Sequence, residues 1–196
     1  EYLEERNVKP VACSEKISVP QNKKFYLTAF SDALAKLMFP QSLIPRSVSS
    51  SFAKRCKKNL NEVSFSLTDD VLTVKWKEGG ATVTVNCGLD GEPRLASCEI
   101  KGYPYKIWAY AYVKEGKINA VIKPINTLAT QYFTFDFQGN TLKMQIKGTP
   151  SYPEFILKNA VDNPIAKKSK VVKKAIIGVM KPVLATTERV MTFKSE

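Results

Sequence analysis

The chain has 196 residues, of which 44% are hydrophobic, and it carries a formal net charge of +12. This hydrophobic content excludes a chain that is disordered throughout, and the lack of any apolar run of about 18 residues excludes a membrane-spanning helix. Histidine is absent, which excludes histidine as a catalytic base or a metal ligand.

The positive charge is concentrated on the two flanks of the chain, before residue 62 and after residue 158. Such flanks can engage a polyanion, an acidic partner or an anionic membrane surface. Solvated helix faces would explain the same excess of charge, and we favour that simpler interpretation.

The four cysteines are separated along the chain and form no Cys-x-x-Cys pair. They are Cys13, Cys56, Cys87 and Cys98. Ligand sets for zinc normally use closely spaced pairs, so we expect buried free thiols rather than a metal site. No cofactor is expected.

Residues 20–40 have the spacing of one amphipathic helix. Leu27, Phe30, Leu34 and Leu37 recur at intervals of three and four, and Pro40 closes the run. A Ser/Pro-rich connection follows at 41–51, and a basic cluster lies at 54–58. We therefore place a boundary near residue 60.

From Val63 onward the hydrophobic period changes to two. Val63, Phe65 and Leu67 alternate with serines, and the alternation returns at 72–76, 81–87, 107–113, 118–122, 132–137 and 142–146, with a less regular strand at 95–101. Residues 102–105 are expected to form a loop, and 190–194 a last short strand. About seven strands are thus expected in 63–147, a pattern typical of an antiparallel barrel or sandwich.

This organisation divides the chain into an N-terminal helix and linker at 1–60, a β-barrel domain at 61–157 and a basic segment at 158–196. Parallel α/β architecture is excluded because no helix separates the strands. We expect the following side chains to be buried in the strand region: Trp76, Val83, Val85, Phe133, Phe135, Leu142 and Met144.

The sequence contains one candidate catalytic pattern. Ser51 and Lys54 match the Ser-x-x-Lys nucleophile pattern of penicillin-recognising enzymes, in which the lysine amine accepts the serine proton. The partner motifs of those enzymes are missing, and a chain with 25 Lys and 14 Ser produces such a match by chance. We interpret the match as accidental, and expect no catalysis from this chain alone.

Three aromatic residues on one strand face are the candidate ligand-binding residues, Trp108, Tyr110 and Tyr112. With lysines between them, they resemble a stacking platform for single-stranded nucleic acid or carbohydrate. Alternate aromatic residues also line barrel interiors and protein interfaces, and we favour that interpretation. Nucleic acid is not an expected partner.

Five lysines of the C-terminal segment are the candidate polyanion-binding or membrane-binding residues. They are Lys167, Lys168, Lys170, Lys173 and Lys174, within a stretch that predicts a basic amphipathic helix ended by Pro182. Such a helix can adsorb to anionic lipid, or its apolar stripe can pack on the barrel. We favour packing because no aromatic anchor accompanies the lysines.

From residue 20 to 147, the order of elements resembles the accessory domain that follows the catalytic domain in bacterial serine hydrolases of the class C β-lactamase and D,D-peptidase type. The resemblance rests on the helix and Ser/Pro connection, on the paired strands ending at Gly88, and on a Trp-bearing strand at 107–113. Its most specific part is INAVIKPINT at 118–127 leading to FTFDFQGNTLKM at 133–144.

The resemblance implies a small lipocalin-like antiparallel barrel that packs on a serine hydrolase domain and shapes access to its active site. That catalytic domain, on the same or a separate chain, would be the partner. No catalytic residue can be carried over because the hydrolase domain is missing, and the segment after Pro164 has no counterpart. The alternatives are an autonomous binder of a small apolar ligand or lipid, and a basic surface binder of polyanions or anionic membranes.

Overall fold

Ten β-strands make up the regular structure in the described part of the chain. The computed structural model describes residues 17–21, 23–28, 62–78, 81–100, 103–125, 130–149, 158, 162, 171, 174–179 and 190–196. The strands are β1 (Lys24–Leu27), β2 (Glu62–Thr68), β3 (Val71–Glu78), β4 (Ala81–Gly88), β5 (Arg94–Ile100), β6 (Tyr103–Lys114), β7 (Lys117–Pro124), β8 (Thr130–Gln138), β9 (Thr141–Thr149) and β10 (Met191–Ser195).

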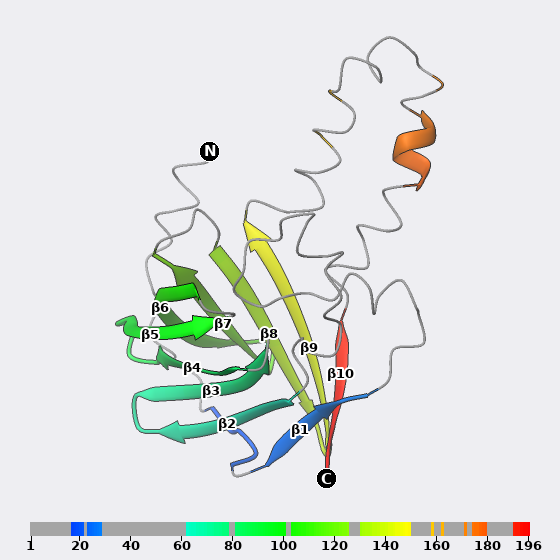
Figure 1. Ribbon diagram of the computed structural model, residues 1–196. Helices are drawn as coiled ribbons and strands as arrows, with labels where there is room; N and C mark the ends of the chain where they lie inside the picture. Colours follow the sequence, from blue (N-terminus) through cyan, green and yellow to red (C-terminus); the bar gives the residue numbers. More distant parts are fainter. Residues whose placement is uncertain are drawn as a thin grey trace.

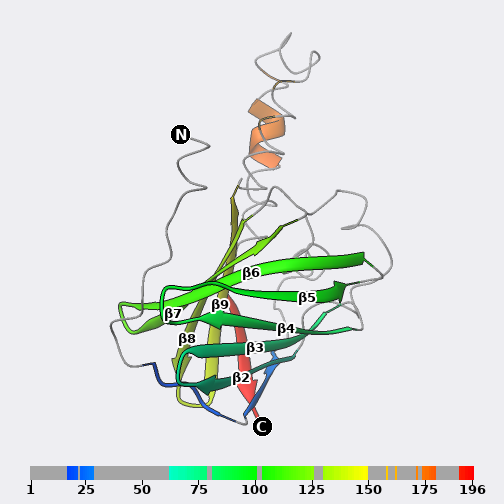
Figure 2. The same cartoon turned by 90° about the vertical axis from the view of Figure 1, so that its left-hand side faces the viewer.

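The strands form one antiparallel sheet that closes into a barrel. Its order is β4-β3-β2-β1-β10-β9-β8-β7-β6-β5, and the sheet closes where Gly88 of β4 meets Tyr110 of β6 in a parallel bridge. In Figure 1, β2 to β4 cross β8 to β10 at a steep angle, and Figure 2 shows β4 and β5 side by side. The predicted mainly β, antiparallel meander closing into a small lipocalin-like barrel is confirmed.

The alternation of the sequence determines which side chains enter the barrel. On β8 and β9, Phe133 lies opposite Ile146, Phe135 opposite Met144 and Phe137 opposite Leu142, as the hydrophobic pattern predicts. All seven side chains predicted to be buried belong to the core. Aromatic rings fill its middle, with Trp76, Phe133, Phe135 and Phe65 in a continuous series of ring contacts.

The hairpin between β6 and β7 is closed by a two-residue turn. Glu115 and Gly116 both have positive φ, at 55° and 70°, between the paired residues Lys114 and Lys117. A two-residue turn of this mirror-image type matches the right-handed twist of the flanking strands. Glycine adopts this backbone freely, whereas glutamate does so at a cost in free energy.

Two local predictions are wrong. Residues 24–27 were predicted as helix but form β1, because β2 and β10 supply hydrogen-bonding partners on both sides and Phe25 enters the core. Such tertiary pairing overrides a local helical spacing. Residues 103–105 were predicted as loop but pair with 98–100 of β5. The strands at 63–147 number eight, close to the expected count of about seven. The rest of the predicted helix, from 29 to 40, lies outside the described residues.

The sheet draws strands from all three predicted segments of the chain. β1 precedes residue 60, and β10 follows residue 157, yet they pair with each other and with the central strands. The predicted last strand at 190–194 is present as β10, one residue later at each end. The boundaries near 60 and 157 stay predictions.

Candidate ligand-binding end of the barrel

In the middle of the barrel, the inner surface of β6 and β7 is lined by small and aliphatic side chains. Ala109 lies opposite Ile122, and Ala111 lies opposite Ala120, with all four buried in the core. On the neighbouring strand β8, Phe133 lies opposite Ala120, so a large ring is placed beside small side chains. The small and large side chains together fill the middle of the barrel, and the polar side chains of the inner face lie toward its ends.

Gln131 is the one buried polar side chain found among the described residues, with 8% of its surface exposed. It lies at the start of β8 on the same inner face as Phe133, opposite Ile122 of β7 and Gly148 of β9. Ile122 and Phe133 beside it are buried apolar side chains. The amide of Gln131, which can both donate and accept hydrogen bonds, therefore lies among apolar walls at the end of the barrel.

A second polar group on the inner face lies at the opposite end of the barrel. The hydroxyl oxygen of Ser195 is buried and has no hydrogen-bond partner among the described residues. Ser195 is the last residue of β10 and lies beside the turn between β8 and β9, where its backbone N–H donates to the carbonyl of Asn140 at 2.9 Å. Because β8 runs from Gln131 toward that turn, Gln131 and Ser195 are separated by the length of the barrel.

Cys87 contributes no reactive group to the interior. Its side chain is buried on β4, opposite Leu72. Burial raises the pKa of this thiol to about 12, because a low-dielectric surrounding disfavours the thiolate. The prediction of a buried free thiol is confirmed for this residue. Cys13 and Cys56 lie outside the described residues, and the side chain of Cys98 is also outside them.

The three predicted ligand-binding aromatic residues lie on the outer face of β6. Ile107, Ala109 and Ala111 occupy the inner positions, so strand alternation directs Trp108, Tyr110 and Tyr112 outward. Trp108 meets Tyr110 edge to face at 5.5 Å, and Tyr110 stacks on Tyr112 at 6.3 Å. The three aromatic side chains lie together on one face, as predicted. The prediction that they line the barrel interior is wrong, because Ala109 and Ala111 occupy the inner positions. Their role in binding stays a prediction.

Tyr110 is nearly enclosed although it faces outward, with 2% of its surface exposed. Desolvation raises the pKa of its phenol to about 12, and the nearby phenols of Tyr112 and Tyr132 add to the rise. Tyr110 is therefore a neutral phenol over the whole physiological range. A ring that is covered in this way cannot stack on a ligand base or sugar.

The other candidates from the sequence fall mostly beyond the described chain. Ser51, Lys54, Lys167, Lys168, Lys170 and Lys173 lie outside the described residues. Lys174 is described, and it is exposed at the beginning of a short helical stretch, 174–179. Its role in binding a polyanion or membrane stays a prediction.

The ion pairs of the barrel wall support the fold rather than a reaction. Glu62 contacts Lys77 at 2.6 Å and Lys24 at 3.5 Å. The hydrogen bond from Lys77 is the main reason that the pKa of Glu62 lies below its usual value. Asp90 pairs with Arg94 at 2.7 Å in the loop before β5, and this hydrogen bond lowers the pKa of Asp90.

Sequence reasoning missed Gln131, although a signal was present. Gln131, Phe133, Phe135 and Phe137 share the period of two that was used to assign this strand. A glutamine at the first inner position interrupts the otherwise apolar inner face of β8, and this interruption is the signal that could have identified it.

Neither a metal-binding cluster nor a membrane-spanning helix is found among the described residues. No group of three or more Cys, Asp and Glu side chains able to hold a metal ion occurs among them. The described residues also contain no helix with the length and apolar character needed to cross a bilayer.

Comparisons with known proteins give only distant likenesses. No family model and no curated protein matches the chain. A solved fatty acid-binding protein from brain tissue of Drosophila melanogaster is 15% identical with a TM-score of 0.41, over 65% of this chain and 90% of that chain. Human cRBP IV is 10% identical with a TM-score of 0.42, over 68% of this chain and 93% of that chain.

Both TM-scores lie below 0.5, so these structures do not indicate a ligand for this chain, and any ligand has to be inferred from its own residues. Neither of these two proteins is a serine hydrolase, and the accessory-domain interpretation gains no support from them.

Proposed function

We propose that the barrel binds a small apolar ligand that carries one polar group, and that Gln131 pairs with this group. The observation that carries the proposal is Gln131 itself, the buried polar residue on an otherwise apolar inner face of β8, with Ile122 and Phe133 as neighbours. The binding site would be the end of the barrel where β8 begins, with Ile122, Phe133 and Ile146 as apolar walls.

The physical argument is the free-energy cost of placing an amide among apolar side chains. An amide without hydrogen bonds in an apolar surrounding costs on the order of 1 to 3 kcal/mol. A leucine at position 131 would avoid this cost and continue the apolar face of β8. A ligand hydroxyl, carbonyl or carboxylate would recover the cost, because the amide both donates and accepts hydrogen bonds.

The aromatic middle of the barrel limits the size of the ligand. Phe133 lies two residues beyond Gln131 on the same face, and its ring centroid is 5.8 Å from that of Trp76. A ligand held by Gln131 therefore places its apolar part against these rings. Single-chain lipids and other slender amphipathic molecules fit such a site better than bulky ones.

The experiment is a titration with a dansylated undecanoic acid, followed by competition with a fatty acid and the corresponding fatty alcohol. Saturable binding and displacement by at least one competitor are expected. Gln131→Leu should weaken the affinity by about fivefold to tenfold, the value of one hydrogen bond. Gln138→Leu is the matched control, because Gln138 is exposed at the far end of the same strand.

Two results would contradict the proposal. The first is an absence of saturable binding by the unmodified chain. The second is an equal loss of affinity in the Gln131 and Gln138 variants, which would indicate adsorption to the outer surface.

The accessory-domain function rests on the sequence resemblance alone. Its direct test is the reading frame that surrounds this chain, where a Ser-x-x-Lys hydrolase domain upstream is the expected result. Such a domain would not by itself exclude a ligand at Gln131.

A further inference from the structure

Two large aliphatic side chains are exposed on the outer face of the barrel, on either side of Trp108. Leu95 is 70% exposed and lies directly opposite Trp108 on β5. Ile125 is 54% exposed and follows β7, where its backbone N–H donates to the carbonyl of Lys106 at 2.7 Å. Together with Lys123, which lies opposite Trp108 on β7, these residues form the Trp108 patch: Leu95, Lys106, Trp108, Lys123 and Ile125.

The chemistry of the Trp108 patch combines three features. Leu95 and Ile125 present apolar surface to solvent, and Trp108 is an amphipathic ring between them. Lys106 is exposed and Lys123 is half-buried, so each combines an apolar stem with a charged ammonium group. Aliphatic anchors, tryptophan and lysine are the side chains that occupy the boundary between lipid headgroups and acyl chains.

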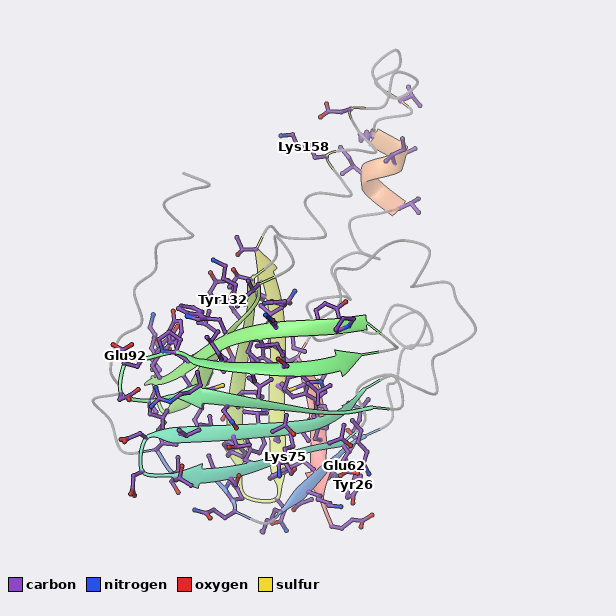
Figure 3. The ribbon with its side chains drawn as sticks, turned by 60° about the vertical axis from the view of Figure 1, so that its left-hand side comes forward. Tyr26, Glu62, Lys75, Glu92, Tyr132 and Lys158 are labelled. Atoms are coloured by element: carbon purple, nitrogen blue, oxygen red, sulfur yellow. The ribbon has the colours of Figure 1, made fainter. Side chains whose placement is uncertain are left out.

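The charges near the Trp108 patch favour an anionic partner. Lys147 adds a third exposed ammonium group on the same outer face, opposite Tyr132 of β8. The loop before β5 carries two acidic side chains, Asp90 and Glu92. Asp90 is paired with Arg94, so Glu92 (Figure 3) contributes the remaining negative charge of this loop. Lysines near an anionic membrane are each attracted by roughly 1 kcal/mol.

We propose that the Trp108 patch docks on the surface of a bilayer that contains anionic lipids. Leu95 and Ile125 enter the headgroup region, and Lys106 and Lys123 pair with anionic headgroups. A single-stranded nucleic acid fits this surface less well, because Tyr110 is covered and two aliphatic chains project where bases would stack. The proposal does not depend on a ligand at Gln131.

The test is co-sedimentation with phosphatidylcholine vesicles and with vesicles of equal parts phosphatidylcholine and phosphatidylserine. The chain should bind the second kind, and raised salt should weaken binding. Leu95→Ser with Ile125→Ser should lower the partition coefficient by about tenfold or more. Lys106→Gln and Lys123→Gln should each lower it by about fivefold.

The matched controls are Lys75→Gln and Val190→Ser, since Lys75 and Val190 are also exposed. In the view of Figure 3, Lys75 lies well below Tyr132. Neither control should change vesicle binding. In the Trp76→Phe variant, the emission of Trp108 should shift to the blue on the anionic vesicles. Circular dichroism of each variant checks that the exposed substitutions leave the barrel folded.

Three results would overturn the proposal. One is the absence of binding to the anionic vesicles. Another is binding that survives the Leu95 and Ile125 substitutions but disappears when Lys167, Lys168, Lys170, Lys173 and Lys174 become glutamine, which would assign it to the C-terminal segment. The third is tight binding of a labelled single-stranded oligonucleotide that the Lys106 and Lys123 variants lose, with no vesicle binding.

Discussion

The two faces of β6 have opposite chemistry although their residues alternate along one strand. The inner face carries Ala109 and Ala111, and the outer face carries Trp108, Tyr110 and Tyr112. Rings from β2, β3 and β8 occupy the middle of the barrel, and β6 places the small side chains of Ala109 and Ala111 beside them. The large residues of β6 therefore cover the wall from outside.

The comparison shows that burial and membership of the core are different properties. Tyr110 is as enclosed as many core residues, yet its neighbours are the phenols of Tyr112 and Tyr132. Gln131 has the reverse character, because it is polar but lies on the inner face. Substitutions at adjacent inner and outer positions can test the distinction directly.

The largest expected effect is a charge on the inner face of β4. Val85→Asp should lower the free energy of unfolding by several kcal/mol, because Val85 is fully buried and an unpaired carboxylate would be desolvated. Thr84→Asp, one residue earlier and outward, should cost about 1 kcal/mol or less. Urea titration of both variants measures the difference, and equal effects would contradict the assignment of the two faces.

The next effect introduces the same residue at adjacent positions of β6. Ala111→Phe should destabilise the barrel by about 1 to 3 kcal/mol, because Ala111 is fully buried opposite Ala120 and a ring there would have to displace its neighbours. Tyr112→Phe removes one outer hydroxyl and should cost about 0.5 kcal/mol or less. Thermal unfolding compares the two, and a well-tolerated Ala111→Phe would show that the middle of the barrel is loosely filled.

A smaller effect is expected at the ion pair that joins β2 to β3. The pKa of Glu62 lies below its usual value because Lys77 donates a hydrogen bond to it. Its ionised form therefore stabilises the fold above the unfolded pKa near 4.5, and that contribution is lost as the pH falls through the lower folded pKa. Glu62→Gln should cost up to about 1 kcal/mol at neutral pH and little in acid.

The measurement is urea unfolding of the unmodified chain and of Glu62→Gln across the acid range. The difference between the two should shrink below pH values near 4.5. A difference that stays constant with pH would show that the charge of Glu62 is irrelevant to stability.

The smallest effect concerns the turn between β6 and β7. Glu115→Asn should stabilise the hairpin by about 0.5 kcal/mol, because asparagine tolerates the positive φ of this position better than glutamate does. Differential scanning calorimetry would record a slightly higher melting temperature. Glu115→Val is the opposing variant, and it should lower the melting temperature because a β-branched residue resists this backbone.

Much of the barrel could be predicted from the sequence because the alternation of Val63, Phe65 and their successors directly reflects burial on one face. The position of β1 could not, since Leu27 and Phe30 also fit a helix and the pairing partners of β1 lie far away in the sequence. Alternation also shows that Trp108, Tyr110 and Tyr112 share a face without showing that the face is the outer one. Predicting that Gln131 is buried required knowledge of which face of β8 is enclosed.

The most direct test of the proposed binding site uses the two tryptophans as reporters at different depths. A brominated fatty acid, added below its micellar concentration without vesicles, quenches a tryptophan that it contacts. In the Trp108→Phe variant, which keeps Trp76 in the core beside Phe133, we predict saturable quenching. In the Trp76→Phe variant, which keeps Trp108 on the outer face, we predict none. Quenching of Trp108 with Trp76 unaffected would contradict a ligand inside the barrel.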